Sequence, residues 1–229
     1  GSTVALTIDI DFQAQVEEAL KSTVSSMTKA DGVERGAAVA VVQVGTGDVL
    51  ALASYPTYSL STFRENISEL SNDSMRPMWN RATQGKYAPG STLKPLTGIA
   101  ALESGATTVR EKIYDSGKWV YPGYSASYTY CWKRSGHGAL NVRGAIMNSC
   151  KPAFIDIGQR MGAQNFAEYF SNFGLTEKTG IDLPGEATSI YHARYTINDL
   201  ASSSFGQTFK VTPIQLITAA SAAVNGGKL

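Results

Sequence analysis

The sequence predicts an α+β fold in which helices pack on an antiparallel sheet. An amphipathic helical pattern opens the chain, and two short apolar runs joined by a glycine-containing turn follow it directly. The later segments carry several helix start and stop signals. A helix packed on an antiparallel sheet is the start of an α+β fold.

The composition is that of an ordinary folded domain. The chain has 229 residues, a formal net charge of +1 and 43% hydrophobic residues, which is enough apolar surface for a core. Because no basic excess is clustered, we expect no nucleic-acid partner and no binding to an anionic membrane surface. No stretch approaches the roughly 18 consecutive apolar residues of a spanning helix.

The first predicted element is a helix over residues 11–28. Asp9 and Asp11 stand before it as capping candidates. Its apolar stripe is formed by Phe12, Val16, Leu20, Val24 and Met27, which recur at helical spacing.

A hairpin follows the helix. Residues 37–44 and 49–54 are short β-prone apolar runs, and Gly45-Thr46-Gly47-Asp48 between them is typical of a tight turn. Residues 55–90 are rich in Ser, Asn, Pro and Arg, so we expect irregular structure there.

Helices dominate the rest of the prediction. Pro89-Gly90 precedes a helix at 91–104, with Pro95 in its first turn and Gly105 as its stop. Further helices are predicted at 141–148 capped by Asn141, at 152–162, at 164–173 and at 212–224.

Ser91 and Lys94 form the first candidate catalytic pair. A lysine three residues after a serine on one helix reaches the same face, where it can take the proton of the serine hydroxyl. The backbone N–H of Ser91 at the helix start is a candidate oxyanion donor. The spacing alone is weak evidence, because Ser26 and Lys29 repeat it on the first predicted helix, where a solvated surface explains them.

The residues that could ligate a metal are few. Cys131, Cys150, His137 and His192 are scattered along the sequence, so we expect no metal site, no cofactor and two buried thiols without a disulfide. We interpret His137, beside Gly138, as a structural residue and not as a general base.

The segment around Ser91 resembles the active-site segment of class B penicillin-binding proteins. Asn80–Thr83 and Tyr87–Pro95 carry this resemblance most specifically. The similarity extends over nearly the whole chain, through Leu6–Asp9 with Gln13 and Glu17, His137–Phe154, Thr179–Glu186, Gly206–Pro213 and Asn225–Gly227.

The resemblance implies a peptidoglycan D,D-transpeptidase. Ser91 would form an acyl-enzyme with a D-Ala-D-Ala stem peptide, an amine of a second stem would resolve it, and β-lactams would acylate the same serine. The parent protein is then expected at the extracytoplasmic face of the bacterial membrane, with its anchor absent here, beside a glycosyltransferase partner.

The second motif of this family departs from its usual form. Where the family has Ser-x-Asn, this chain has Ser149-Cys150-Lys151. The resemblance gives Ser149 a catalytic role in proton transfer and places Lys151, Cys150 and Thr92 in substrate binding. An ammonium at position 151 would lower the pKa of Lys94 but removes an amide acceptor, so we expect altered turnover.

The third family motif, Lys-Thr/Ser-Gly, has a false match at Lys178-Thr179-Gly180. Pro184 follows too closely for a central strand, so we reject this match. We expect one transpeptidase domain over residues 1–229, truncated before the true motif and lacking a separate second domain. A second chain or a swapped protomer would then complete the sheet.

Two other functions remain open at this point. One is a non-catalytic sensor or scaffold that binds β-lactam or peptidoglycan, with Lys151 marking lost catalysis. The other is a serine β-lactamase, for which we see no specific residue that would activate a deacylating water.

Overall fold

The computed structural model describes residues 2–123, 128–191 and 195–229, so His192 lies outside the described residues. The chain divides into two compact units. The first unit comprises Gly1–Lys86, Lys178–Thr188 and Thr212–Leu229, and the second comprises Tyr87–Glu177 and Ser189–Val211.

The first unit opens with helix α1, Ile10–Asp31. The Asp9 side chain accepts hydrogen bonds from the backbone N–H groups of Asp11 and Phe12, which satisfies donors that a helix start leaves unpaired. Gly32 ends the helix in the left-handed conformation, with φ of 73°. The predicted helix is confirmed, and it extends beyond the predicted 11–28.

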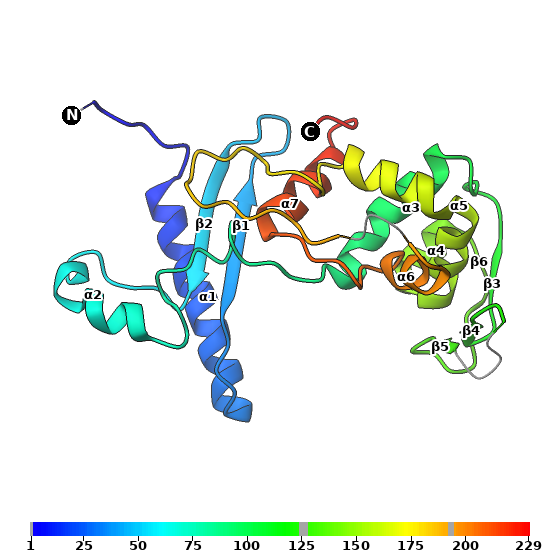
Figure 1. Cartoon of the computed structure of the whole chain (residues 1–229), viewed down its shortest axis with the longest axis horizontal. Helices are drawn as coiled ribbons and strands as arrows, with labels where there is room; N and C mark the ends of the chain where they lie inside the picture. Colours follow the sequence, from blue (N-terminus) through cyan, green and yellow to red (C-terminus); the bar gives the residue numbers. More distant parts are fainter. Residues whose placement is uncertain (1, 124–127, 192–194) are drawn as a thin grey trace. The chain divides into compact units, whose positions relative to one another are not determined.

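The antiparallel hairpin is also confirmed. β1, Ala37–Val42, pairs with β2, Val49–Tyr55, with a register shift between Val41 and Val42. Helix α1 packs against β2, and α7, Pro213–Ala222, packs against β1 (Figure 1). This unit therefore has the predicted α+β architecture, helices on an antiparallel sheet.

The prediction of irregular structure over residues 55–90 is wrong in part. Helix α2, Phe63–Asn72, lies within this range. None of its residues is buried, although Phe63, Ile67 and Leu70 recur at helical spacing along it. This short apolar stripe is interspersed with polar residues, and the prediction passed over it.

The second unit is built around helix α5, Lys151–Asn172. It packs against α3, Lys94–Glu103, and α6, Ile197–Ser203. Gly158 makes the second contact possible, because a Cβ atom there would lie 2.5 Å from Ser204 Cβ. The core of this unit includes Leu93, Leu96, Phe154, Ile155, Ile157, Phe166 and Phe170, all of which are buried.

The predicted break between helices at 152–162 and 164–173 is present as a kink. Gly162 has φ of 79° and ψ of 163° inside α5, a conformation that side-chain-bearing residues rarely adopt. Helix α4, Val142–Met147, begins as predicted, since the Asn141 side chain accepts a hydrogen bond from Gly144 N–H over 3.0 Å.

Four short strands of the second unit were not predicted. β3, Ile113–Asp115, pairs with β6, Gly138–Leu140, and β4, Lys118–Val120, pairs with β5, Tyr128–Tyr130. Each has three residues, which is too short for an alternating pattern to stand out.

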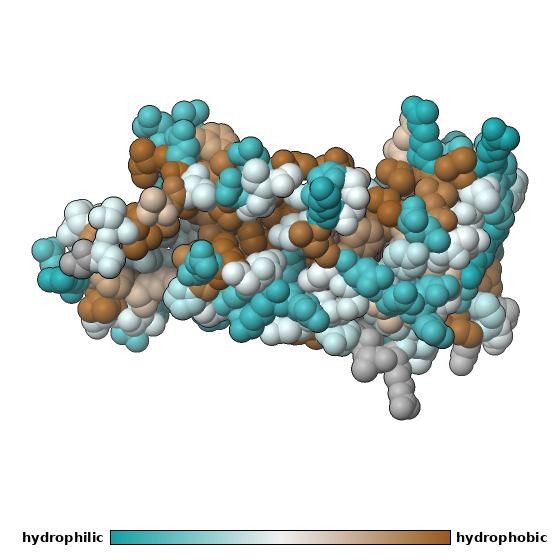
Figure 2. Space-filling model, turned by 90° about the horizontal axis from the view of Figure 1, so that it is seen from above, coloured by the Kyte–Doolittle hydropathy of each residue, from teal (hydrophilic) through white to brown (hydrophobic). Residues whose placement is uncertain are grey.

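The surface is mixed in character. On the face drawn in Figure 2, hydrophilic and hydrophobic side chains are interspersed, as on most globular proteins. Among the described helices, none has the length and apolar character needed to cross a bilayer.

Candidate active site

Ser91 lies in a short 3₁₀ turn, η1, Gly90–Leu93, which continues directly into α3. The turn is fixed by a backbone contact, because Gly90 N–H donates a hydrogen bond to Gly206 O over 2.8 Å. A Cβ atom at Gly206 would lie 2.0 Å from Gly90 O, so only glycine permits this approach. The Ser91 side chain is exposed at this position.

Ser149 joins Ser91 to Lys94. Lys94 Nζ donates to Ser149 Oγ over 2.9 Å and to the backbone oxygen of Ser149 over 2.7 Å. Ser149 Oγ in turn donates to Ser91 Oγ over 3.1 Å. The three predicted catalytic residues therefore form one hydrogen-bonded row, in which the hydroxyl of Ser149 stands between the other two.

The backbone of Ser149 is held in an unusual conformation. Its φ of 46° lies in the left-handed region, which costs of order 1 kcal/mol or more for a residue with a side chain. The surrounding contacts stabilise this conformation, and they aim its hydroxyl at Ser91 and Lys94.

Lys94 is buried, with 1% of its surface exposed. Burial lowers the pKa of Lys94 to about 8, and the charge of Lys151 contributes in the same direction, whereas the electrostatic interaction with Cys150 and Cys131 opposes them. A lysine with this pKa is partly neutral near neutral pH and can therefore accept a proton.

Two further predicted site residues lie close in sequence to the row of Ser91, Ser149 and Lys94: Thr92 in η1 and Lys151 at the start of α5. Lys151 is exposed at the start of α5, with Nζ 5.6 Å from the ring centre of Phe205. Thr92 is exposed in η1, where its hydroxyl donates to Pro89 O over 2.6 Å. Both side chains are accessible to a ligand.

Cys150 does not present its thiol to solvent. It is 0% exposed, and its Sγ lies 3.2 Å from Asp115 Oδ2. A fully buried thiol offers no atom to a substrate, so we withdraw Cys150 from the substrate-binding residues.

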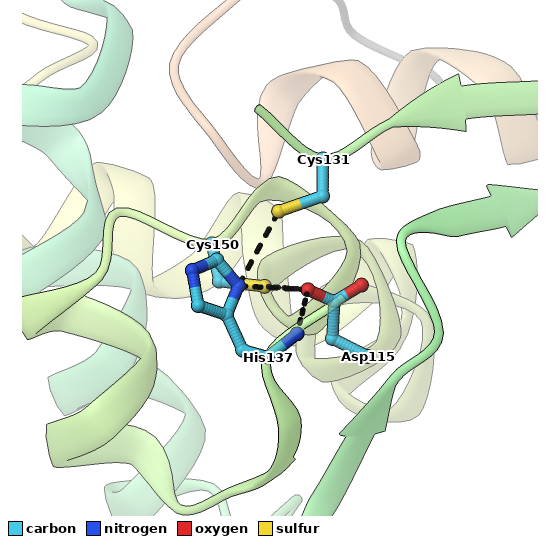
Figure 3. Close-up of side chains that lie close together, drawn as sticks. All are labelled: Asp115, Cys131, His137 and Cys150. Atoms are coloured by element: carbon cyan, nitrogen blue, oxygen red, sulfur yellow. Dashed lines mark hydrogen bonds and ion pairs between the residues drawn. The ribbon is translucent and has the colours of Figure 1, made fainter. Parts of the chain in front are cut away.

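A second cluster gathers around this thiol. Ligand atoms of Asp115, Cys131, His137 and Cys150 all lie within 4.8 Å of one another (Figure 3). Cys131, His137 and Cys150 were expected to lie apart, and the structure brings them together, whereas the predicted free, buried thiols are confirmed. Asp115 was not singled out, because nothing in its local sequence distinguishes it.

The electrostatics of the cluster centre on Asp115. Burial alone would raise its pKa, but hydrogen bonds from Gly117 N–H, His137 and the Cys150 thiol together lower it to about 2. Burial raises the pKa of both thiols. The site thus holds a buried carboxylate beside two protonated thiols.

Lys178-Thr179-Gly180 belongs to the first unit and forms a loop, not a strand. The carboxylate of Glu186 accepts hydrogen bonds from Thr179 N–H over 2.7 Å, from Thr179 Oγ1 over 2.8 Å and from Gly180 N–H over 3.2 Å. These contacts give the tripeptide a structural role.

A buried lysine linked to two serine hydroxyls is an arrangement typical of serine acyltransferases. The family model described as "Penicillin binding protein transpeptidase domain" matches residues 37–229. The chain therefore belongs to the penicillin-binding protein transpeptidase family and is similar to its class B members.

Curated relatives match over the whole chain. Stage V sporulation protein D of Bacillus subtilis is 34% identical over 232 residues, which cover 100% of this chain and 34% of that protein. Peptidoglycan D,D-transpeptidase MrdA of Escherichia coli K12 is 33% identical over 243 residues, covering 99% of this chain and 36% of MrdA. The chain thus spans about a third of the length of these relatives.

Solved structures show the same fold. PBP2 of Pseudomonas aeruginosa, in complex with WCK 5153, matches with a TM-score of 0.81 and 29% identity, covering 95% of this chain and 50% of that chain. Penicillin-binding protein A of M. tuberculosis, an imipenem acyl-enzyme complex, matches with a TM-score of 0.77 and 26% identity, covering 90% and 50%. The predicted α+β penicillin-binding fold is confirmed.

Proposed function

We propose that this chain carries the acylation machinery of a peptidoglycan D,D-transpeptidase that is inhibited by β-lactams, acting at the extracytoplasmic face of the bacterial membrane. The observation that carries the proposal is the hydrogen-bonded row from Ser91 through Ser149 to the buried Lys94. The name of MrdA and the imipenem acyl-enzyme of penicillin-binding protein A support it.

In the acylation step, Ser91 Oγ attacks the carbonyl carbon between the two terminal D-alanines of a stem peptide. Its proton passes to Ser149 Oγ, while Ser149 gives its own proton to neutral Lys94. The backbone N–H of Ser91 stabilises the negative charge on the carbonyl oxygen. The C–N bond then breaks, and D-alanine leaves with a proton returned along the same row.

In the second step, an amine of a neighbouring stem peptide attacks the Ser91 ester. A new amide bond forms, the ester bond breaks, and Ser91 recovers its proton. Lys151 and Thr92, both exposed, are the residues of this part of the chain that we propose to contact the substrate. The Lys151 ammonium suits a carboxylate or carbonyl oxygen of the stem. The parent protein would work beside a glycosyltransferase that supplies the glycan strands.

Intact-mass spectrometry after incubation with a penicillin tests the proposal, on this chain and on the product of its complete gene. We expect a stoichiometric adduct that Ser91→Ala removes, with Ser26→Ala as the matched control because Ser26 has the same spacing to a lysine. An adduct that forms equally without Ser91, or none on the complete product, would falsify the assignment.

The fate of the adduct separates the rival functions. A long-lived adduct together with cross-linking of two stem peptides supports the transpeptidase. Prompt hydrolysis of the penicillin identifies a β-lactamase, and a stable adduct without cross-linking on the complete product identifies a sensor.

A further inference from the structure

The hairpin formed by β4 and β5 has one packed face and one exposed face (Figure 1). Side chains alternate between the two faces of a strand, and residues paired in register share a face. Trp119 and its partner Thr129 are half-buried, and both strands pack against α5. Tyr128 and Tyr130 lie on the opposite face, where 41% and 42% of their surface is exposed. Packing explains the first face and leaves the second without a role.

Two cations stand beside the exposed tyrosines. Arg134 Cζ lies 3.5 Å from the ring centre of Tyr130, and Lys118 Nζ lies 5.5 Å from the ring centre of Tyr128. The two ring centres are 4.7 Å apart. Attraction between each cation and the adjacent ring restrains the long side chains, which lowers the cost of fixing them on a ligand. We call these four residues the tyrosine face.

The segment that contains the tyrosine face is strongly positive. Residues 116–155 include no aspartate or glutamate, although the net charge of the whole chain is only +1. Among the residues that the structure describes, no carboxylate forms an ion pair with Lys118 or Arg134. An occupant of the face therefore needs negative charge as well as a surface that suits aromatic rings. The exposed cations of the segment are Lys118, Lys133, Arg134, Arg143 and Lys151.

Trp132 connects the tyrosine face to the acylation row. Its side chain is 68% exposed, and its Nε1–H donates a hydrogen bond to Asn148 O over 2.8 Å. Asn148 directly precedes Ser149, the middle residue of the row. Trp132 in turn lies two residues beyond Tyr130, at the end of β5. A chain-like ligand on the tyrosine face can therefore continue over Trp132 toward Ser91.

We propose that the tyrosine face binds the sugar rings of the peptidoglycan strand whose stem peptide acylates Ser91, an inference that rests on the proposed function. The C–H bonds on one side of a pyranose ring carry partial positive charge, which suits the negative face of an aromatic ring. Carboxylates of the attached stem suit the guanidinium of Arg134 and the ammonium of Lys118. A saccharide that bears carboxylates uses both parts of the face, whereas a polyphosphate uses the cations alone.

This contact gives the enzyme a reason to prefer stems that are attached to glycan. Binding energy from a part of the substrate remote from the reacting carbonyl can raise kcat/KM without any change in the acylation row. The tyrosine face is therefore a determinant of substrate choice, and its residues take no part in proton transfer.

Release of D-alanine from two matched donors tests the inference on the product of the complete gene. One donor is a disaccharide pentapeptide, and the other is the same pentapeptide without sugars. We expect a kcat/KM about tenfold higher for the donor with sugars. Tyr128→Ala and Tyr130→Ala should each lower this ratio by about threefold or more, while the kcat/KM of the sugar-free donor and the rate of penicillin acylation stay at wild-type values.

Tyr114→Ala is the matched control, because Tyr114 is an exposed tyrosine of β3 outside the tyrosine face. It should keep the full preference for the donor with sugars. Equal kcat/KM for the two donors in the wild type overturns the inference. So does a preference that both Tyr128→Ala and Tyr130→Ala leave unchanged.

Binding without acylation provides a second readout. The Ser91→Ala chain, which cannot form the ester, is titrated in a calorimeter with the disaccharide pentapeptide, with polyphosphate and with phosphatidylglycerol vesicles. We expect the disaccharide pentapeptide to bind most tightly, and Tyr130→Ala or Arg134→Gln in this background to weaken it by about threefold or more. Tighter binding of polyphosphate or of vesicles, lost in the same variants, overturns the inference in favour of a phosphate polymer or a membrane surface.

The two experiments distinguish failure of this inference from failure of the proposed function. If the proposed function is wrong, neither donor releases D-alanine and penicillin forms no adduct at Ser91. The calorimetric titration then still decides whether the tyrosine face binds sugar, because it requires no acylation. If the inference alone is wrong, the adduct and the release of D-alanine remain, and the preference for sugars is absent.

Discussion

Ser149 Oγ donates a hydrogen bond to Ser91 Oγ over 3.1 Å across 58 residues of sequence. The same oxygen accepts from Lys94 Nζ over 2.9 Å, so the contact between Ser91 and Lys94 passes through a second serine. Five predictions follow from this row and from the loop that matches the third family motif in sequence alone.

Ser149→Ala should slow the formation of the penicillin adduct by about 100-fold to 10,000-fold, the range typical of a lost proton-transfer group. The rate is measured from the time course of the adduct in intact-mass spectra. Ser171→Ala, an exposed serine elsewhere on α5, is the control and should label at the wild-type rate. Equal rates for both variants would remove Ser149 from the mechanism.

The acylation rate should rise with pH and level off above the pKa of Lys94, which burial lowers to about 8. The reason is that only the neutral amine accepts a proton, and its fraction increases as pH passes through this pKa. The rate is measured from about pH 6 to about pH 10.

Lys151→Ala should move this pH profile to higher pH, because the charge of Lys151 contributes to the lowered pKa of Lys94. A matched change at Lys178, an exposed lysine of the first unit, should leave the profile in place. A shift of the Lys151→Ala profile toward lower pH contradicts the prediction.

Lys94 should also make the stability of the chain depend on pH. Its folded pKa of about 8 lies below the ordinary 10.5, so the folded state binds fewer protons between these values, and stability rises with pH in this window. Relative to Lys94→Met, the wild-type free energy of unfolding should therefore rise by about 3 kcal/mol between about pH 7 and about pH 11. Urea unfolding of both proteins measures it, and a constant difference would show that Lys94 is not destabilised when charged.

Lys178→Ala should leave the acylation rate unchanged, because Lys178-Thr179-Gly180 is a loop and not a strand of a catalytic cleft. Glu186→Ala should instead reduce the free energy of unfolding by about 2 kcal/mol, since it removes the acceptor of three hydrogen bonds. A large loss of acylation in Lys178→Ala would contradict this prediction and would show that Lys178-Thr179-Gly180 is a functional motif.

The sequence was most informative where local rules decide structure. Helix α1 has a regular apolar stripe and a capping aspartate, and the hairpin has two apolar runs with a glycine turn, so both follow from neighbouring residues. Ser91, Lys94 and Ser149 were found through the family resemblance. Their order in space, with Ser149 in the middle, depends on the left-handed backbone of Ser149. Serine has no preference for this conformation, so the sequence does not predict it.

Other features depend on contacts between distant segments. Asp115, Cys131, His137 and Cys150 lie on four segments that short strands and glycine turns bring together, so their spacing along the sequence does not predict the cluster. Helix α2 is a different case, because Phe63, Ile67 and Leu70 have helical spacing and the surrounding polar composition led to a prediction of irregular structure. The motif Ser149-Cys150-Lys151 does not by itself show that the Cys150 side chain is buried and therefore inaccessible to a substrate.

Ser149 and Cys150 are adjacent in the sequence but belong to different groups of side chains. Ser149 belongs to the hydrogen-bonded row with Ser91 and Lys94, and Cys150 belongs to the buried cluster around Asp115. This adjacency constrains which substitutions the protein can accept. A substitution at either residue must be compatible with both the hydrogen-bonded row and the buried cluster. A larger side chain in place of the buried Cys150 would displace its neighbours, and the left-handed backbone of Ser149 beside it would move with them. The middle position of the second motif is therefore constrained by packing, although its side chain does not reach the surface.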